Sequence, residues 1–405
     1  MGIGQCFEVI DIHRREDIVQ RRKQILFFSP GYHDLGGAAG RSRNIAVGLA
    51  DRGWRVRMVV RAGSLRRLRV TRRPNLVVVE VPGFDAPRTG ALLFLLVSLP
   101  LGVLWARKAT AVLALQLMSP STAGAMSAGL WRRPFIALAT TSGQLSELDY
   151  ILGSGPVKIR RALLRSAAFI VGQTADAAVE LGRLADSDHI AVLPNPVQTV
   201  SSHPLNGDPV VLFSGRFSSE KDLPRLLDAW EILAQELPSA QLRLVGAGGN
   251  YRSIEQLLRN RVANSDTLQR SVAFVGWVTD IGGQLVTADV FAFPSLSEGM
   301  SNSLLEACAW KRVIVASDIP ANRAVLGDDY PLLFPVGDTL ALVTGLRTAL
   351  TDETIRLAAV ACVSRRLPLF STQTVLTQLE DLIALAQRHR ERLRSPRTAG
   401  RAANG

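Results

Sequence analysis

Residues 289–306 read DVFAFPSLSEGMSNSLLE, and they are the most informative segment of the chain for the expected fold class. The apolar run Asp289–Phe293 predicts a buried strand that ends at the following proline. A helix is then expected to start near Ser301. Glu298 therefore falls in a loop at the carboxyl end of a strand, and Glu306 falls inside the following helix.

This edge of an open α/β sheet is where ligands bind, and a helix N-terminus offers free N–H groups to phosphate. Two carboxylates beside an anion site suit a ligand that is part polyol and part diphosphate, such as a nucleotide sugar. The same residues also admit a purely structural interpretation. Ser303 and Glu306 have the spacing of a capping box, and Glu298 fits a solvated loop acid.

The length and composition place the chain in a broad class. A chain of 405 residues suggests two domains, and 47% apolar with 20% charged residues is normal for a soluble globular protein. The three cysteines, Cys6, Cys308 and Cys362, are widely spaced. They match neither a disulfide framework nor a metal site, so we expect a reducing cytoplasm and no bound metal.

Two segments bear on membranes. Met1–Gln24 lacks the basic head, apolar run and small cleavage site of a signal peptide. The apolar run Ala91–Ala106 contains Pro100 and falls short of the ~20 residues that span a bilayer. We expect a buried or interfacial helix there.

The formal net charge is +12, and two arginine clusters contribute to it. One precedes the apolar run and the other lies in the tail: Arg66, Arg67, Arg69, Arg72 and Arg73, and Arg390, Arg392, Arg394, Arg397 and Arg401. Basic residues beside an apolar stretch suit an anionic membrane surface. Nucleic-acid binding and a solvated basic face are the competing interpretations, although no zinc-finger, RNP-type or basic-zipper pattern is present.

Strand-like and helix-like segments alternate along the whole chain. The expected strands are Gln24–Ser29, Arg55–Val60, Leu76–Val81, Ala111–Gln116, Phe135–Thr140, Ala168–Gly172 and Ile190–Leu193, then Val210–Phe213, Leu242–Val245, Val272–Val275, Asp289–Phe293, Val313–Ala316 and Leu332–Phe334. Such alternation predicts an α/β fold of parallel sheets covered by helices on both faces.

The proline-rich and turn-rich segment from Pro194 to Pro209 predicts the domain break. We expect two doubly wound, Rossmann-like domains, at 1–196 and 209–372, that face each other across a cleft. A C-terminal helix at 373–394 has an apolar face that would brace both domains. The remaining residues, 395–405, are expected to form a disordered basic tail.

Two more loops of the second domain are expected on the ligand-binding edge. Arg216 and Lys221 follow the first strand of this domain, where a guanidinium and an ammonium group would neutralise a diphosphate. Two solvated bases in a surface loop are the alternative. The run Gly246-Ala247-Gly248-Gly249 would let the backbone approach a flat ligand such as a nucleobase.

The first domain has its own glycine loop, Pro30–Gly37, before an expected helix. Gly36 and Gly37 would bring N–H groups close to a phosphate, but the spacing is not G-x-G-x-x-G, which argues against a dehydrogenase. His33 and Asp34 are ionisable side chains of the same loop. They are either acceptor-side catalytic groups or residues that satisfy hydrogen bonds of the turn.

Together these motifs resemble the family 4 retaining glycosyltransferases, also described as glycosyl transferases group 1, which have the GT-B fold. The match runs through Gly215-Arg216-x4-Lys221, Val245-Gly246-x-Gly248, Val275-Gly276, Phe293-Pro294-Ser295-x-x-Glu298-Gly299-Met300-Ser301-Asn302, Leu304-Leu305-Glu306-Ala307 and Val315-Ala316-Ser317. The first domain shares only the Gly36-Gly37 loop, the strand-helix rhythm and Leu193-Pro194-Asn195.

The resemblance implies roles for individual residues. Arg216 and Lys221 would hold the donor diphosphate, Glu298 would contact hydroxyl groups of the donor sugar, and Glu306 would contact the ribose. The other residues expected at the donor come from the glycine loops and the helix start: Gly36, Gly37, Gly215, Gly246, Gly248, Gly299, Met300, Ser301 and Asn302.

Two departures from the family pattern stand out. Many members carry a histidine after the strand that here ends near Thr140, and this chain has none there. That acceptor-side contact would be lost or come from one of three nearby polar residues, Ser142, Gln144 and Glu147. The glycine that usually ends the helix of Glu306 is replaced by Lys311, where a left-handed cap would cost about 1 kcal/mol relative to glycine.

The resemblance implies transfer of a sugar, with retention, from a nucleotide-diphosphate sugar to a glycan or lipid-linked acceptor in bacterial exopolysaccharide, capsule or lipopolysaccharide synthesis. We expect the nucleotide sugar as co-substrate, no metal or other cofactor, and no nucleic-acid partner. The protein would be cytoplasmic, at the inner face of the plasma membrane. A sugar-nucleotide epimerase of the same architecture and a basic nucleic-acid or membrane-binding protein are the alternatives.

Overall fold

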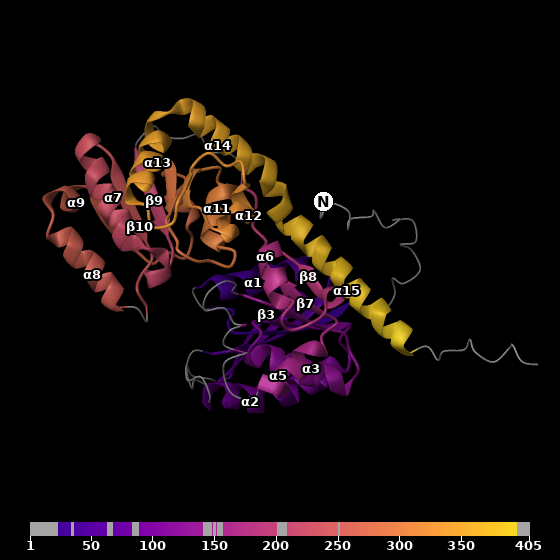
Figure 1. Cartoon of the computed structure of the whole chain (residues 1–405). Coiled ribbons are helices and arrows are strands. Elements are labelled where there is room, and N and C mark those ends of the chain that lie inside the picture. Colours follow the sequence, from indigo (N-terminus) through magenta and orange to yellow (C-terminus); the bar gives the residue numbers. More distant parts are fainter. Residues whose placement is uncertain are drawn as a thin grey trace, which may run out of the picture.

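A computed structural model describes residues 23–33, 36–62, 68–82, 89–140, 148, 151, 157–200, 209–249 and 252–394. Figure 1 shows two α/β units, which we call the first and the second domain, joined by a long C-terminal helix. The strands of the first domain are β1 Gln24–Ser29, β2 Arg55–Arg61, β3 Arg69–Arg73, β4 Leu76–Val81, β5 Ala111–Leu115, β6 Phe135–Leu138, β7 Phe169–Gly172 and β8 Ile190–Val192. Its helices are α1 Gly37–Asp51, α2 Thr89–Ala106, α3 Ser119–Leu130, α5 Val157–Arg165 and α6 Ala175–Leu181.

The second domain follows the same alternation. Its strands are β9 Val210–Ser214, β10 Gln241–Val245, β11 Val272–Gly276, β12 Val290–Phe293, β13 Val313–Ser317 and β14 Leu333–Phe334. Its helices are α7 Leu223–Glu236, α8 Arg252–Ala263, α9 Asp266–Ser271, α10 Gly282–Leu285, α11 Asn302–Ala309, α12 Pro320–Leu326, α13 Thr339–Thr351 and α14 Glu353–Arg366, and α15 Thr372–Arg394 ends the described chain.

The first sheet has the order β3-β4-β2-β1-β5-β6-β7-β8. Its strands pair in parallel except β3, which pairs antiparallel with β4 at the edge. Strand β3 was not among the strands expected from the sequence. Arg69, Arg72 and Arg73, which were expected only as part of a basic cluster, lie on β3 and are exposed. A short, charged edge strand lacks the apolar run that identifies buried strands, and its charges protect the edge from pairing with another chain.

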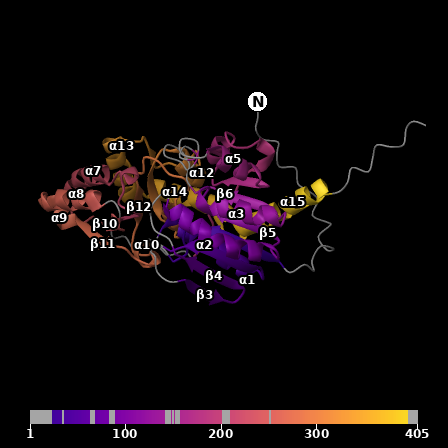
Figure 2. The ribbon, with the colours of Figure 1, turned by 90° about the horizontal axis from the view of Figure 1, so that it is seen from below.

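Alternate residues of each strand face opposite layers of helices. In β1, Ile25 and Phe27 pack in the core that includes α1 and α15, whereas Leu26 and Phe28 pack in the core that includes α2 and α3. Figure 2 shows α2 and α3 in front of the first sheet in a view from below. The inner strands, such as β1 and β5, are therefore buried on both faces, which confirms the expected doubly wound α/β arrangement.

The second sheet has the order β11-β10-β9-β12-β13-β14, and all its pairs are parallel. From β9 the chain adds β10 and β11 toward one edge of the sheet, and from β12 it adds β13 and β14 toward the other edge, so the strand order reverses between β9 and β12. At such a switch point the loops after the neighbouring strands diverge and leave a crevice at the carboxyl edge of the sheet. The loops after β9 and β12 carry Lys221 and Glu298, so the topology places both side chains at one crevice.

The C-terminal helix α15 returns to the first domain after the chain has completed the second. Its apolar face, Val375, Leu376, Leu379, Ile383 and Ala386, belongs to the core of the first domain. A Cβ on Gly48 of α1 would meet the Leu376 side chain at 2.3 Å, so these two helices are in close contact. Figure 1 shows α15 reaching from the second domain along the first.

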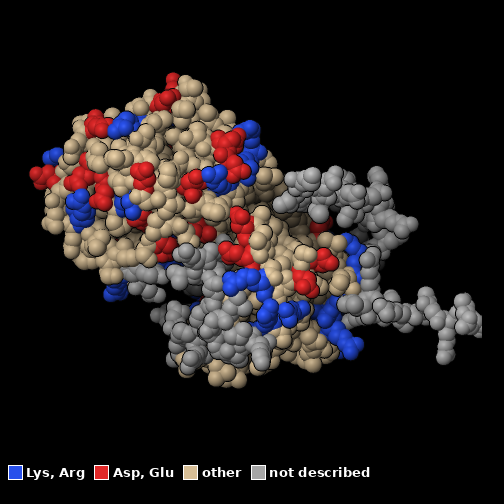
Figure 3. Space-filling view, in the orientation of Figure 1, with Lys and Arg blue, Asp and Glu red and all other residues tan. Residues whose placement is uncertain are grey.

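Helix α2 is long and apolar enough to cross a membrane by length and composition, and 28% of it is buried. It packs on the first domain through Phe94, Ser98, Gly102 and Ala106, which recur every fourth residue. Figure 3 shows positive and negative side chains interspersed over the second domain, whereas Lys and Arg gather on part of the first domain.

Candidate functional site

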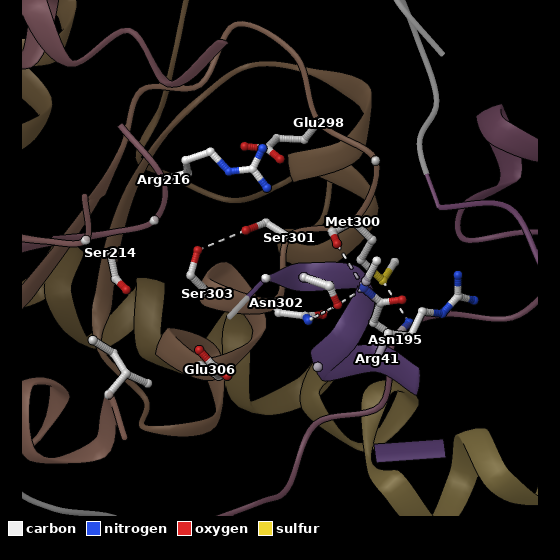
Figure 4. Close-up of a pocket in the computed structure, with 18 of the residues that line it drawn as sticks. Arg41, Asn195, Ser214, Arg216, Glu298, Met300, Ser301, Asn302, Ser303 and Glu306 are labelled. Carbon is white, nitrogen blue, oxygen red and sulfur yellow. Dashed lines mark hydrogen bonds between the residues drawn. The ribbon is translucent and has the colours of Figure 1, made fainter. Parts of the chain in front are cut away.

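A cleft of about 690 Å³ lies between the two domains. Arg216, Lys221, Glu298 and Glu306 all line it, although they come from separate loops and one helix turn of the second domain. The first domain contributes the start of α1, including Gly36 and Gly37, on the opposite wall. Figure 4 shows Arg216 and Glu298 at one end of the cleft and Glu306 at another.

The loops after β9 and β10 approach each other so closely that a side chain cannot fit between them. Gly246 has φ +137°, and a Cβ on it would lie 1.8 Å from the carbonyl oxygen of Gly215. Phe217 donates its backbone N–H to Ala247 O at 3.0 Å, which ties the same two loops together. Glycine at 246 is therefore required by the backbone packing that shapes this wall of the cleft.

Lys221 and Glu298 form an ion pair between the loops after β9 and β12. Their side chains are only 12% and 11% exposed, and the Lys221 Nζ also lies 5.1 Å from the ring centre of Phe293. The backbone N–H of Leu296 donates to Glu220 O at 2.8 Å, which joins the same two loops a second time. Because an ammonium group has three N–H donors, Lys221 can keep Glu298 as a partner and still donate to an anion in the cleft.

The N-terminus of α11 opens into the same cleft. Ser301 is its N-cap, and the Ser301 hydroxyl accepts the backbone N–H of Leu304 at 3.4 Å. The hydroxyl groups of Ser301 and Ser303 are hydrogen-bonded to each other at 3.0 Å. Helix starts leave N–H groups without intrahelical acceptors, so those of Asn302 and Ser303 suit an anion. Since α11 begins at Asn302, Ser303 is not the N-cap, and the capping-box interpretation of Glu306 is wrong.

Glu306 is half-buried in the second turn of α11. Burial, together with the nearby Asp280 carboxylate, raises the pKa of Glu306 to about 7 from its ordinary value of 4.5. A carboxyl group with such a pKa exchanges its proton near neutral pH. Once Glu306 has released its proton, the carboxylate can accept a hydrogen bond from a ligand hydroxyl group.

Side chains of the first domain reach across the cleft to the loop before α11. Gln173 Oε1 accepts the N–H of Met300 at 3.0 Å, and Gln173 Nε2 donates to Asn195 Oδ1 at 2.9 Å. Asn195 Nδ2 donates to Met300 O at 2.9 Å and to Asn302 Oδ1 at 2.8 Å, and Asn302 Nδ2 donates to Gly37 O at 2.9 Å. Figure 4 shows the contacts of Asn195 as dashed lines.

This interdomain network corrects one expectation. Met300, Ser301 and Asn302 were expected together at the donor, but the backbone N–H of Met300 already donates to Gln173. The N–H groups available at this loop are therefore those further into α11. Gln173 and Asn195 are only 5% and 2% exposed, so the network is shielded from water.

Arg41 of α1 also lines the first-domain wall and is 1% exposed. Its guanidinium donates to Ala139 O at 2.6 Å and to Leu193 O at 3.0 Å, at the ends of β6 and β8. These bonds join α1 to the carboxyl edge of the sheet and fix the first-domain wall.

Not every expected site residue lies in the cleft. Gly215, Gly299, Ser301 and Asn302 line it, but Gly248 does not: its N–H donates to Glu255 Oε2 at 2.8 Å. His33 is also outside the lining, with Nε2 at 3.1 Å from Thr71 Oγ1 and at 3.9 Å from Glu80 Oε1. The other expected acceptor-side residues, Asp34, Ser142, Gln144 and Glu147, lie outside the described residues.

Several lining residues were not expected from the sequence: Gln116, Thr140, Gln173, Trp277 and Asp280. The first three follow strands β5, β6 and β7. A polar residue in the first or second position after an apolar strand is a usable signal, because parallel strands share one ligand-binding edge. Asn195 was noted only as part of the resemblance, and its contacts depend on the two domains meeting.

The profile of the family described as glycosyl transferases group 1 matches residues 208–352. The chain is similar to phosphatidyl-myo-inositol mannosyltransferase of Mycolicibacterium smegmatis, with 32% identity over 174 residues, or 42% of this chain and 43% of the relative. It is also 28% identical over 153 residues to a Campylobacter jejuni N-acetylgalactosaminyltransferase named for a diphospho-undecaprenol acceptor, covering 37% of this chain and 40% of that one. The chain thus spans about half the length, or less, of these curated relatives.

Solved structures match over nearly the whole chain. Sucrose-phosphate synthase from Thermosynechococcus elongatus superposes with a TM-score of 0.71 at 21% identity, covering 90% of this chain and 98% of that one. HepE of Anabaena in complex with UDP and glucose gives 0.70 at 20% identity, covering 89% and 99%. Residues 208–352 therefore match the family described as glycosyl transferases group 1, and the chain as a whole has the GT-B fold.

Proposed function

We propose that this protein is a glycosyltransferase that moves a sugar from a nucleotide-diphosphate sugar to a glycan or lipid-linked acceptor in bacterial cell-surface synthesis. The observation that carries the proposal is the convergence of Arg216, Lys221, Glu298 and Glu306 in one interdomain cleft, beside the N-terminus of α11. Two cations and a helix N-terminus suit a diphosphate, and two carboxylates suit sugar and ribose hydroxyl groups.

The similarity to named relatives supports the substrate classes. The mannosyltransferase and the diphospho-undecaprenol-dependent enzyme are both named for lipid-linked acceptors, and another relative is named as a lipopolysaccharide core glycosyltransferase of Rhizobium meliloti. HepE was solved with UDP-glucose. Because all three relatives are named as sugar-transferring enzymes, the epimerase interpretation has no support.

The residues in the cleft suggest how the reaction proceeds. Breaking the bond between sugar and diphosphate places negative charge on the leaving group. Arg216, Lys221 and the N–H groups at the start of α11 all line the cleft and would stabilise this charge. Glu298, held by Lys221, would accept hydrogen bonds from the sugar and fix its orientation.

We infer two finer properties. Since two cations already oppose the diphosphate charge, transfer should not require a metal ion, and the resemblance suggests retention of the anomeric configuration. The measurements are transfer activity in the presence of EDTA and the anomeric configuration of the product by NMR. Loss of activity restored by Mg²⁺ would contradict the first property, and an inverted product would contradict the second.

The test of the proposed function begins with thermal shifts. A ligand that binds only the folded state raises the Tm, so a panel of nucleotide sugars and bare nucleotides identifies the donor. With that donor at saturation, we expect Arg216→Ala and Lys221→Ala each to lower turnover by about 10²–10³, equivalent to ~2.7–4 kcal/mol of barrier. Arg243→Ala, in the middle of β10 and outside the cleft lining, is the control. Wild-type turnover in both cleft variants would refute the proposal.

We also propose that the protein works at the inner face of the plasma membrane. On α2, Leu92, Leu96 and Leu104 recur at multiples of four residues and are 59%, 63% and 64% exposed. Leu130 of α3 is also exposed, and Trp131 donates its Nε1–H to Val103 O at 2.7 Å, so it borders the same surface. We call these five side chains the α2 surface.

Basic side chains adjoin the α2 surface. The Arg107 guanidinium lies 5.8 Å from the ring centre of Trp131, and the Arg57 guanidinium lies 5.2 Å from that of Trp105. An apolar stripe bordered by arginine fits a helix lying in the plane of an anionic bilayer.

Vesicle flotation tests this location. We expect the protein to float with phosphatidylglycerol-containing vesicles, and Leu96→Glu with Leu104→Glu to weaken this binding by about tenfold or more per leucine. Leu340→Glu is the matched control, because Leu340 is 70% exposed on α13 of the second domain. Equal flotation of the double variant and the control would contradict membrane docking by α2.

A further inference from the structure

Gln116 has a backbone conformation that its side chain disfavours. Among the described residues other than glycine, positive φ angles occur at five positions: Asn75, Gln116, Arg132, Asp222 and Lys311. Four of these belong to turns or helix ends, which require a left-handed residue. Gln116, with φ +77°, is the one that lines the cleft.

The main chain of Gln116 is already fully used. Its N–H donates to Leu138 O at 2.8 Å, and its carbonyl accepts the hydroxyl of Ser121 at 2.8 Å. The part of Gln116 that remains for the cleft is the side-chain amide, which is half-buried and makes no hydrogen bond within the described part of the chain.

Glycine would adopt this φ without strain, and asparagine with little. Strained residues other than glycine persist mainly at functional sites, where the side chain compensates for the conformation. Lys311 and Arg132 are not among the residues that line the cleft. Gln116 is both strained in its backbone and part of the cleft wall.

We propose that the amide of Gln116 binds a carbohydrate hydroxyl group in the cleft, on the wall opposite the cationic site of the second domain. A carboxamide offers both a donor and an acceptor, which matches a hydroxyl group better than it matches a phosphate. Gln116 follows β5, and Thr140 follows the neighbouring β6 and also lines the cleft, so the two define one polar strip on this wall. The hydroxyl belongs either to the transferred sugar or to the acceptor.

This inference rests on the proposed function, and the experiment separates the two. The nucleotide sugar found in the thermal-shift panel and the corresponding bare nucleoside diphosphate are titrated against wild type, Gln116→Gly and Gln116→Leu. If wild type binds no nucleotide sugar, the proposed function fails. If wild type binds, the variants decide the role of Gln116.

We expect Gln116→Gly to raise the Tm by about 2 °C, because it relieves the positive φ. It should also weaken binding of the nucleotide sugar by about tenfold and leave binding of the bare diphosphate unchanged, if the hydroxyl belongs to the donor. Gln116→Leu keeps the Cβ and removes the amide, so it should show the same loss of affinity without the gain in Tm.

If the hydroxyl belongs to the acceptor, both affinities stay at the wild-type level. Transfer of radiolabelled sugar to a lipid extract of the producing cells then falls about tenfold, while hydrolysis of the donor does not change. Arg132→Gly is the matched control, because it relieves a positive φ of 49° outside the cleft lining and should change the Tm alone. Wild-type binding and wild-type transfer in both Gln116 variants would overturn the inference.

Discussion

Glu306 is the residue whose environment departs most from what its sequence position suggests. Its pKa of about 7, raised by burial and then by Asp280, means that the folded protein prefers the protonated carboxyl group. A folded-state pKa above the unfolded value contributes stability that is fully present below pH ~4.5 and is lost as the pH rises through ~7. The preference of the folded protein for the protonated form of Glu306 is on the order of 3 kcal/mol.

We therefore expect the Tm of the protein without ligand to fall between pH 5 and pH 7.5, and the Glu306→Gln variant to show a smaller fall. Differential scanning calorimetry across this range makes the measurement. Glu255→Gln is the control, because hydrogen bonds from Gly248 and Arg259 lower the pKa of Glu255, so its own contribution has the opposite sign. Parallel Tm profiles for wild type and Glu306→Gln would show that Glu306 is not protonated in the folded protein.

At the scale of elements, α11 ends in a conformation that its sequence does not favour. Lys311 has φ +53° and donates its N–H to Cys308 O at 2.9 Å, and Arg312 N donates to Ala307 O at 3.1 Å. This is the Schellman pattern, in which glycine normally occupies the left-handed position. The left-handed cap expected from the sequence is confirmed.

Lys311→Gly should therefore stabilise the protein by about 0.5–1 kcal/mol, since relief of the left-handed strain exceeds the added entropy of the unfolded chain. Urea unfolding followed by circular dichroism measures the change. Lys311→Ala, which keeps the Cβ and the strain, serves as the control and should give no gain. A Lys311→Gly variant no more stable than Lys311→Ala would contradict this account of the cap.

At the scale of the whole molecule, the interdomain network makes the donor side depend on side chains of the first domain. Asn195 bonds to Met300 and Asn302, and its loss leaves their buried oxygens without a donor, at about 1–3 kcal/mol. We expect Asn195→Ala to weaken nucleoside diphosphate binding and to increase the radius of gyration measured by small-angle X-ray scattering. Asn264→Ala, at an exposed position after α8, is the control. An unchanged radius of gyration together with unchanged binding would show that the network does not hold the domains together.

The elements of both sheets were predictable because their signals are local. Apolar runs such as Val210–Phe213 and Val313–Ala316 are buried on both faces, so each strand can be read from its own residues. Strand β3 was missed for the converse reason, since its arginines are exposed at a sheet edge and carry no apolar run. The strained left-handed cap at Lys311 was also predictable, because the end of a helix can be recognised from neighbouring residues alone.

The α/β class followed from the sequence, and so did the position of Arg216, Lys221 and Glu298 in loops after expected strands, where the carboxyl edge of a parallel sheet lies. The GT-B architecture and the donor-binding roles of these residues and of Glu306 were implied by the family resemblance. Three features are visible only in the folded protein: Gln173 accepts the N–H of Met300, Asn195 joins the two domains, and Gln116 lines the opposite wall of the cleft. The contacts of Gln173 and Asn195 with Met300 join residues more than a hundred positions apart. They depend on how two separately folded sheets meet, which no local pattern of apolar and polar residues encodes.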